Sequence, residues 1–445
     1  MTHHSLSQRI TQTFIAIFLF SSLLVACASG STGSGSGNTP QASRLSPTAP
    51  PTPITQPVPP TQTDCPPDHT GRALVTAPIV QGKNPQLVYI PSGSPDYLRR
   101  MVRYDTVTHT TTDIVKVPEN TVIKYIILAS NDPWVFFVTG PDSHYPSPVG
   151  TLQAVRIDGQ GLQTLYCDIS GVYSLVSPDH HYIAFADYAQ YPEAPDTIHL
   201  FDTTTGQIFD KIKTPLQTTK PYDDPVPYLW LSNTQLYLHD KSDPGFRGRV
   251  YSDFASNVYL LDTNSADNQL LDALNAVTKQ SNTSITTDGS SLYMSQQQCQ
   301  DQSKIVCSPG TLVKSTISRL ATQGGDASPF YESAQLAIDT IKMIDSQSLL
   351  VSGSNDSANT YEIWTVNTNG SNAKRIASVP LVSTENGGYR TVGNVSGDHT
   401  QFLVTNWHTD PVEGPQMYIG SVQDGTLTPL QPNVTYLFAT GWTML

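Results

Sequence analysis

A unit of four short β-type runs, recurring along most of the chain, constrains its fold more than any other feature. The clearest copy spans residues 172–212 and consists of four runs rich in Val, Ile, Tyr and Phe, separated by turn residues. Its first turn is Ser177-Pro178-Asp179-His180, and similar turns recur at Asp132, Asp288, Asp345 and Asp398. The spacing from Asp132 to Asp179 is 47 residues, and from Asp345 to Asp398 it is 53. A period of this size with four strands per unit is typical of β-propeller blades.

The number of first runs predicts an all-β fold, a β-propeller of seven four-stranded blades. Six of them lie near Ile123, Tyr173, Tyr228, Ile285, Ile341 and Val392, and the seventh spans residues 435–443. The seventh has no second run after it, whereas Leu87 to Ile90 forms a second run with no first run before it. We therefore expect the N- and C-terminal strands to pair within one blade, which closes the ring and removes exposed strand edges.

The repeat resembles the TolB-like and WD-repeat-like propellers of bacterial periplasmic proteins. The resemblance extends over roughly residues 84–445 and is carried best by Ser177-Pro178-Asp179 followed by Ile183-Ala184-Phe185. His180 stands where these families usually have Gly. The resemblance implies a role in protein–protein interactions in the cell envelope, although a propeller fold by itself is compatible with many activities.

The N-terminus is typical of an exported protein, with residues 1–26 as signal peptide. Arg9 precedes an apolar run from Phe14 to Leu24, which is shorter than the roughly 20 residues of a transmembrane helix. Leu24-Val25-Ala26-Cys27 resembles the lipobox of bacterial lipoproteins. The resemblance implies lipidation of Cys27 with acyl chains such as palmitate. The alternative is an ordinary signal peptide with a chance cysteine. We expect an extracytoplasmic protein whose only membrane attachment is this lipid, on the cell membrane or on an outer membrane where one exists.

Composition divides the remaining chain into a tether, residues 27–70, which is rich in Ser, Gly, Pro and Thr, and a propeller domain, residues 71–445. With Cys27 lipidated, four cysteines remain, an even number that suits an oxidising compartment. Cys299 and Cys307 are close in sequence and are expected to form one disulfide, which leaves Cys65 to pair with Cys167. A metal site is the alternative, but the CxxC spacing and nearby His of zinc sites are missing.

Several function classes find no support in the sequence. The formal net charge is −13 with Lys and Arg dispersed, which argues against nucleic-acid binding. The repeated Asp residues suit tight turns, where the carboxylate accepts backbone N–H groups. No hydrolase motif such as Gly-x-Ser-x-Gly is present in the domain, so we assign no catalytic residue, cofactor or metal. We expect a monomer.

The connections between second and third runs are long and leave the same face of the domain, because the strands of a blade are antiparallel. Two of them, residues 187–196 and 240–256, belong to neighbouring blades and contain the aromatic and Arg residues that are enriched at binding sites. The predicted ligand-binding residues are Tyr188, Tyr191, Phe246, Arg247, Arg249 and Tyr251. Alternatively, the arginines merely pair with acids of their own loop.

These observations predict a non-catalytic binding or scaffold lipoprotein whose ligand is an envelope or extracellular protein, a peptide or a glycan. The alternative hypothesis is an envelope enzyme, a lyase or glycosidase, with its site in the central mouth of the propeller.

Overall fold

The structure is a computed structural model of the 445-residue chain. It divides the chain into two units, residues 1–54 and 55–445, and all described residues belong to the second. The described residues are 57–67, 70–80, 82–91, 98–128, 132–141, 150–169, 171–187, 197–213, 225–240, 258–264, 270–271, 283–302, 304, 306–322, 325–381, 389–407, 416–430 and 441–444. Within these residues, no helix has the length and hydrophobicity needed to span a membrane.

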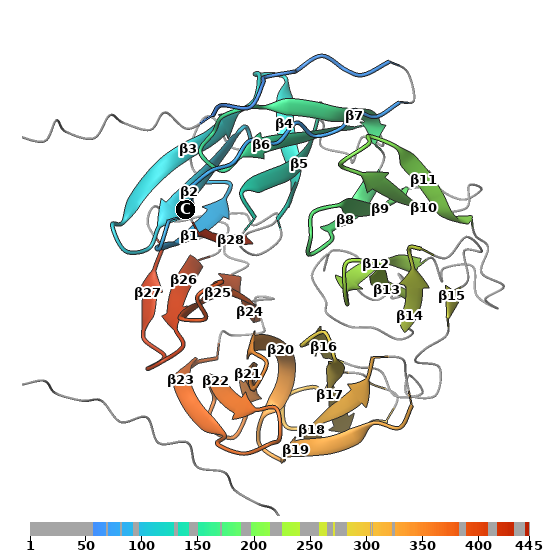
Figure 1. The fold of residues 1–445 in the computed structure, drawn as a ribbon. Coiled ribbons are helices and arrows are strands. Elements are labelled where there is room, and N and C mark those ends of the chain that lie inside the picture. Colours follow the sequence, from blue (N-terminus) through green and yellow to red (C-terminus); the bar gives the residue numbers. More distant parts are fainter. Residues whose placement is uncertain are drawn as a thin grey trace, which may run out of the picture. The chain divides into compact units, whose positions relative to one another are not determined.

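The second unit is a seven-bladed β-propeller, as the repeat predicted: seven four-stranded antiparallel sheets are arranged in a ring (Figure 1). Blade 1 contains β4 (Thr121–Ile127), β5 (Trp134–Pro141), β6 (Gly150–Arg156) and β7 (Gln163–Ile169). Blade 2 contains β8 (Gly171–Val176), β9 (Tyr182–Asp187), β10 (Thr197–Asp202) and β11 (Ile208–Lys213). Blade 3 contains β12 (Pro225–Trp230), β13 (Gln235–Asp240), β14 (Val258–Asp262) and β15 (Leu270–Leu271).

The remaining blades follow the same order around the ring. Blade 4 contains β16 (Ser284–Thr287), β17 (Ser291–Cys299), β18 (Leu312–Ala321) and β19 (Ser328–Ser333). Blade 5 contains β20 (Ala337–Asp345), β21 (Ser348–Asn355), β22 (Thr360–Asn367) and β23 (Lys374–Pro380). Blade 6 contains β24 (Tyr389–Val395), β25 (Gln401–Trp407), β26 (Gln416–Ser421) and β27 (Leu427–Pro429). Blade 7 contains β28 (Gly441–Met444), β1 (Pro85–Tyr89), β2 (Arg100–Asp105) and β3 (Thr110–Lys116).

Blade 7 confirms the expected closure by the two ends of the domain. The last strand, β28, pairs with β1 in the register Leu87↔Trp442 and Val88↔Gly441. Trp442 is 2% exposed and packs in a cluster with Leu87, Tyr89 and residues of blade 6. Its indole N–H donates to the carbonyl of Asn394 in β24, at 2.8 Å. The seam is therefore closed by backbone pairing, by a buried aromatic side chain and by a hydrogen bond to the preceding blade.

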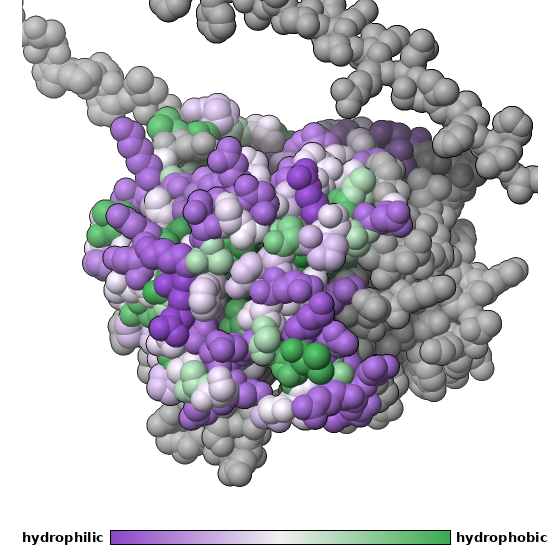
Figure 2. Space-filling view, turned by 90° about the horizontal axis from the view of Figure 1, so that it is seen from below, coloured by the Kyte–Doolittle hydropathy of each residue, from purple (hydrophilic) through white to green (hydrophobic). Residues whose placement is uncertain are grey.

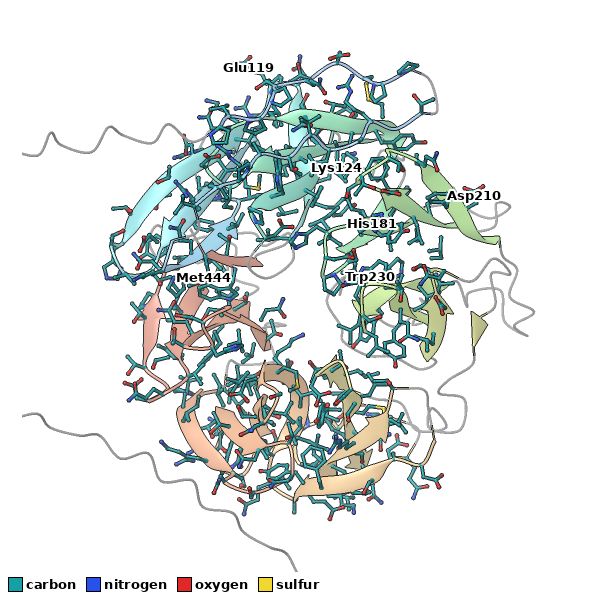
Figure 3. All side chains as sticks on the ribbon, viewed as in Figure 1. Glu119, Lys124, His181, Asp210, Trp230 and Met444 are labelled. Carbon is teal, nitrogen blue, oxygen red and sulfur yellow. A yellow bond between two sulfur atoms is a disulfide. The ribbon has the colours of Figure 1, made fainter. Side chains whose placement is uncertain are left out.

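Neighbouring blades are joined by apolar packing and by hydrogen bonds between their innermost strands. Between blades 1 and 2, Phe136, Leu152 and Phe185 belong to one buried cluster. Burial of each such side chain is worth about 1.5–3 kcal/mol. Trp230 of blade 3 donates its indole N–H to the carbonyl of Leu175 in blade 2, at 3.3 Å (Figure 3). Large apolar residues with high exposure are few among the described residues: Val58, Val75, Val80, Val107 and Val313.

The antiparallel order gives the domain two distinct faces. The connections between first and second strands and between third and fourth strands lie on one face, which we call the turn face. The connections between second and third strands lie on the opposite face, which we call the loop face. On the turn face, Asp179 Oδ1 accepts from Ser177 Oγ at 2.7 Å and from the backbone N–H of His181 at 3.1 Å. Asp398 makes the equivalent bonds in blade 6, which confirms that these acids close turns.

The described residues 57–80 form a segment that packs against the outer strand of blade 1, and we call it the strap. Gln62 pairs with Gln163 of β7, and Cys65 forms a disulfide with Cys167 of the same strand. Cys299 and Cys307 form the second disulfide, so both expected pairings are confirmed. Pro57, Gln62 and Cys65, which belong to the segment that composition assigns to the tether, contact blade 1.

Candidate functional site

The predicted ligand-binding residues of the two long loops lie outside the described residues, as does Cys27. This applies to Tyr188, Tyr191, Phe246, Arg247, Arg249 and Tyr251. The strands that carry these loops are described. The first loop leaves β9 after Asp187 and returns at Thr197, and the second leaves β13 after Asp240 and returns at Val258.

The structure brings the roots of both loops to the loop face of adjacent blades. The inner strands β8 and β12 are in contact, and residues of blades 2 and 3 share one buried cluster that includes Ile198, Leu236 and Leu238. The strand ends from which the two loops leave therefore belong to neighbouring, contacting blades.

A third connection on the loop face is largely described, and it is fixed to the next blade. The segment between β17 and β18 contains the Cys299–Cys307 disulfide. Gln297 accepts the N–H of Cys307 at 2.9 Å and donates to the carbonyl of Ile338 in blade 5, also at 2.9 Å. The N–H of Gly310 donates to Asp356 Oδ2, in the connection between β21 and β22, at 2.6 Å. On the loop face, the connection of blade 4 is therefore closed by a disulfide and joined to blade 5 by hydrogen bonds.

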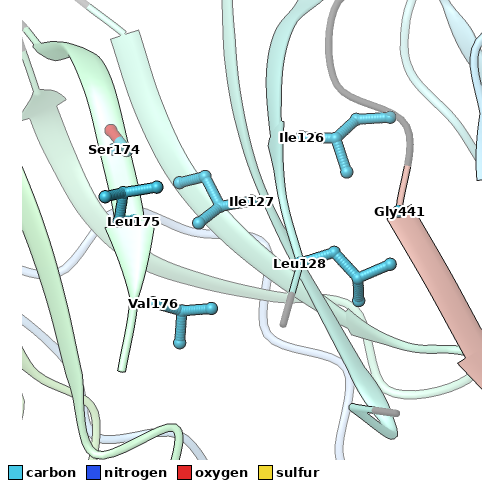
Figure 4. A pocket seen from close by; sticks show the side chains of 7 residues that line it. All are labelled: Ile126, Ile127, Leu128, Ser174, Leu175, Val176 and Gly441. Carbon is cyan, nitrogen blue, oxygen red and sulfur yellow. The ribbon is translucent and has the colours of Figure 1, made fainter. Parts of the chain in front are cut away.

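A small apolar pocket lies between the inner strands β4 and β8 and the start of β28 (Figure 4). Its lining residues are Ile126, Ile127, Leu128, Ser174, Leu175, Val176 and Gly441. Leu128 projects toward Gly441, where a Cβ atom would come within 2.6 Å of the leucine side chain. The hydroxyl of Ser174 is buried without a hydrogen-bond partner. The cavity measures about 130 Å³, less than half the roughly 300 Å³ at which small-molecule sites begin. It can hold only a few heavy atoms.

Charged residues on the inner strands do not form a pair of catalytic acids. Among the residues of these seven strands, the only acids are Asp339 and Asp345, both on β20. Six residues of extended strand separate them by roughly 20 Å, whereas glycosidase carboxylates lie about 5–9.5 Å apart. Asp339 Oδ1 accepts hydrogen bonds from Tyr361 and Ser352, at 3.1 and 3.2 Å. Within the part of the chain that the structure describes, no group of three His, Cys, Asp or Glu residues is arranged to hold a metal ion.

The inner strand β4 contains a lysine whose position the repeat pattern did not predict, because a β-bulge sets it. Lys124 is the extra residue of β4 between Ile123 and Tyr125, where the register with β5 shifts. Its side chain lies across Gly140, where a Cβ atom would come within 2.5 Å of the Lys124 Cε atom. Burial lowers the pKa of Lys124 below its usual value. Figure 3 shows Lys124 in blade 1.

The turn face holds a buried carboxyl group that the turn pattern did not reveal. Asp132 is fully buried, and its Oδ1 accepts the N–H of Trp134 at 2.7 Å. Its Oδ2 lies 3.3 Å from Nε2 of His180, which belongs to the next blade. Burial raises the pKa of Asp132 to about 8 and lowers that of His180. His180 has a φ of 61°, a conformation that favours the Gly usually found at this position. The two side chains lie against each other where blades 1 and 2 meet, and Asp132 Oδ2 is buried without a hydrogen bond.

The surface shown in Figure 2 is mainly hydrophilic, and apolar residues form small, separate patches on it. Scattered apolar residues of this kind are normal on soluble domains, whereas binding sites are marked by larger continuous patches.

Comparison with known proteins finds similarity at the level of the fold alone. No protein-family model matches the chain, and no curated protein does. The periplasmic gluconolactonase of Pseudomonas aeruginosa is 15% identical, with a TM-score of 0.49, over 81% of this chain and 99% of that one. An uncharacterised protein from Listeria monocytogenes is 12% identical, with a TM-score of 0.49, over 86% and 100% of the two chains. A putative TolB from Agrobacterium tumefaciens is 12% identical, with a TM-score of 0.33, over 79% and 89%.

The fold and the pairing of its two ends define the protein as a seven-bladed β-propeller. Its two disulfides are typical of a protein that folds outside the reducing cytoplasm.

Proposed function

We propose that this protein is a lipid-anchored, non-catalytic binding or scaffold protein outside the cytoplasm, and that its loop face binds a protein, a peptide or a glycan. The observation that carries the proposal is that the connections 188–196 and 241–257 leave the same face of adjacent blades. Their sequences supply Tyr, Phe and Arg, the residue types that dominate binding energy at interfaces. Loops on a rigid scaffold are also where binding residues concentrate.

The aromatic and Arg content of these loops also indicates the chemistry of the ligand. The domain is acidic overall, with a formal net charge of −13 for the chain, so Arg247 and Arg249 are local exceptions. Arg binds carboxylate and phosphate groups through two parallel hydrogen bonds. A ligand with an anionic group beside an apolar or aromatic one fits this composition best.

Crosslinking in intact cells, followed by identification of the captured protein or glycan, tests the proposal. Once a partner is known, Phe246→Ala and Arg249→Ala should each weaken its binding more than about fivefold, equivalent to about 1 kcal/mol. The matched control is Ser346→Ala on the turn face, in an exposed turn, which should leave binding unchanged. If all three variants bind like the parent protein, the loop face is not the binding site and the central mouth becomes the next candidate.

Lipid anchoring is tested separately, because it depends on Cys27 alone. The Cys27→Ser variant should move from the membrane fraction to the soluble fraction of exported protein, since its apolar run is too short to anchor it. A variant that stays in the membrane fraction after a high-salt wash would show that the attachment is not the lipid.

A further inference from the structure

The strap fixes the point at which the chain enters the propeller. A single buried side chain, Arg156 at the end of β6, holds both ends of the strap: its Nη1 donates to the carbonyl of Pro57 at 2.7 Å and to that of Pro78 at 3.2 Å. The other guanidinium nitrogens, Nε and Nη2, donate to the two carboxylate oxygens of Asp158, at 3.0 and 2.7 Å. The Arg156 side chain is only 1% exposed, so these bonds are shielded from water. Such two-pronged Arg–carboxylate pairs hold a rigid geometry.

Arg156 and Asp158 lie on the turn face of blade 1, because the connection from β6 to β7 joins a third strand to a fourth. Pro59 packs beneath Gly161 of this same connection, where a Cβ atom would come within 2.2 Å of the proline ring. Gly161 has a φ of 65°, so this position tolerates little besides glycine. Residues 57–59 are therefore held at the turn face.

From that point the strap runs along β7 toward the loop face and then returns. Thr164 donates its N–H to the carbonyl of Gln62 at 2.7 Å, and the disulfide to Cys167 follows further along the strand. On the way back, Gln163 is fully buried and bonds both backbone groups of Val75, each at 2.9 Å. The N–H of Leu74 donates to the carbonyl of Thr203 in blade 2, at 2.7 Å. A disulfide, a buried Arg and a buried Gln thus fix the path of the strap over the blades.

We infer that the anchored chain enters the propeller at its turn face, so that a short tether turns this face toward the membrane and the loop face away from it. The inference rests on the proposed lipid anchor at Cys27. The first described residue, Pro57, is held at the turn face, and the strands β9 and β13 end at Asp187 and Asp240 on the opposite face. The loop face is then open to a molecule that approaches from the aqueous side.

Two positions in blade 5 provide a matched pair of probes. Ser346, between β20 and β21, is exposed on the turn face, and Ala358, between β21 and β22, is exposed on the loop face. The eight residues of β21 separate them by about 25 Å. Both mature disulfides are closed, so Ser346→Cys and Ala358→Cys each introduce one labelling site. The full lipidated chain carrying a fluorophore at either site is placed in vesicles whose lipid headgroups carry a quencher.

The tether must be short for the two faces to differ clearly, because a flexible tether of its full length spans about 30 Å on average. Deletion of residues 30–50 leaves eight residues between Cys27 and Pro57, which limits the reach to about 30 Å when fully extended. With this deletion, the fluorophore at position 346 should be quenched at least twice as strongly as that at position 358.

Equal quenching at the two positions, or stronger quenching at 358, in the shortened and membrane-bound protein would overturn the inferred orientation alone. If neither fluorophore is quenched and the protein leaves the vesicles as the Cys27→Ser variant does, the lipid anchor itself is wrong and the orientation falls with it. These two failures are distinguished by sedimentation of the vesicles before fluorescence is read.

Discussion

Asp132 should make the stability of the propeller fall as the pH rises above neutrality. Burial holds the pKa of this carboxyl at about 8 in the folded protein, against a reference value of 3.8. The folded protein therefore retains a proton that the unfolded chain releases. The stabilisation is fully present below pH 3.8 and is lost as the pH rises toward 8. Below about pH 6.5 the lowered pKa of His180 contributes with the opposite sign, so the window from 6.5 to 8 isolates Asp132.

The expected magnitude follows from the width of that window. One proton over 1.5 pH units corresponds to about 2 kcal/mol, at about 1.4 kcal/mol per unit. For a domain of this size, that energy shifts the melting temperature by about 2–3 °C. The Asp132→Asn variant keeps the acceptor for the Trp134 N–H but cannot ionise. It should therefore lose about 2 kcal/mol less than the parent protein between pH 6.5 and 8.

The assay is thermal unfolding of both proteins at pH 6.5, 7.25 and 8, with Asp345→Asn as the matched control. Asp345 occupies the equivalent turn of blade 5. Burial raises the pKa of its carboxyl, but hydrogen bonds from Gln347 and Ser348 outweigh this effect and hold the pKa below its usual value. This control should follow the parent protein, because Asp345 stays ionised over the whole window. If the melting temperature of the Asp132→Asn variant depended on pH as that of the parent does, the proposal that Asp132 is buried in its protonated form would be refuted.

Three further predictions concern the contacts that hold the ring and the strap. Trp442→Ala should lower the free energy of unfolding by about 3–5 kcal/mol, measured by urea unfolding, because the indole fills the closing seam; a loss below about 1 kcal/mol would contradict this role. Cys299→Ala combined with Cys307→Ala should cost up to about 2–3 kcal/mol in the same assay and leave the other disulfide intact; equal stability with and without the bond would count against it. Arg156→Met should make the strap a site of limited proteolysis, since Asp158 and the carbonyls of Pro57 and Pro78 lose their donor; a strap that resists cleavage as in the parent would show that Arg156 does not hold it.

The sequence predicted the features that repeat or that depend on pairing within the chain. The inner strands, the closure by β28 and β1, and both disulfides were readable from period, position and cysteine number. The disulfide that fixes Cys65 to blade 1 was among these, whereas the contacts of the strap with Arg156 and Gln163 were not, because both residues are far away in sequence.

The buried state of Asp132 was hidden for a related reason. Its turn reads like that of Asp179, and only the packing of the blades covers it with His180 from one neighbour and Thr443 from the other. Local pattern therefore identified the turn correctly, whereas the raised pKa of its carboxyl comes from burial between packed blades.

The pairing of β1 with β28 also determines when the ring can close during synthesis and export. The partner of β1, near the start of the domain, is β28 at residues 441–444. Until those residues have been synthesised and exported, β1 presents an unpaired edge and the ring stays open. An exported chain held at an earlier point would expose that edge to other extended chains. We therefore expect the period between export of β1 and export of β28 to be when the nascent protein most needs protection from aggregation.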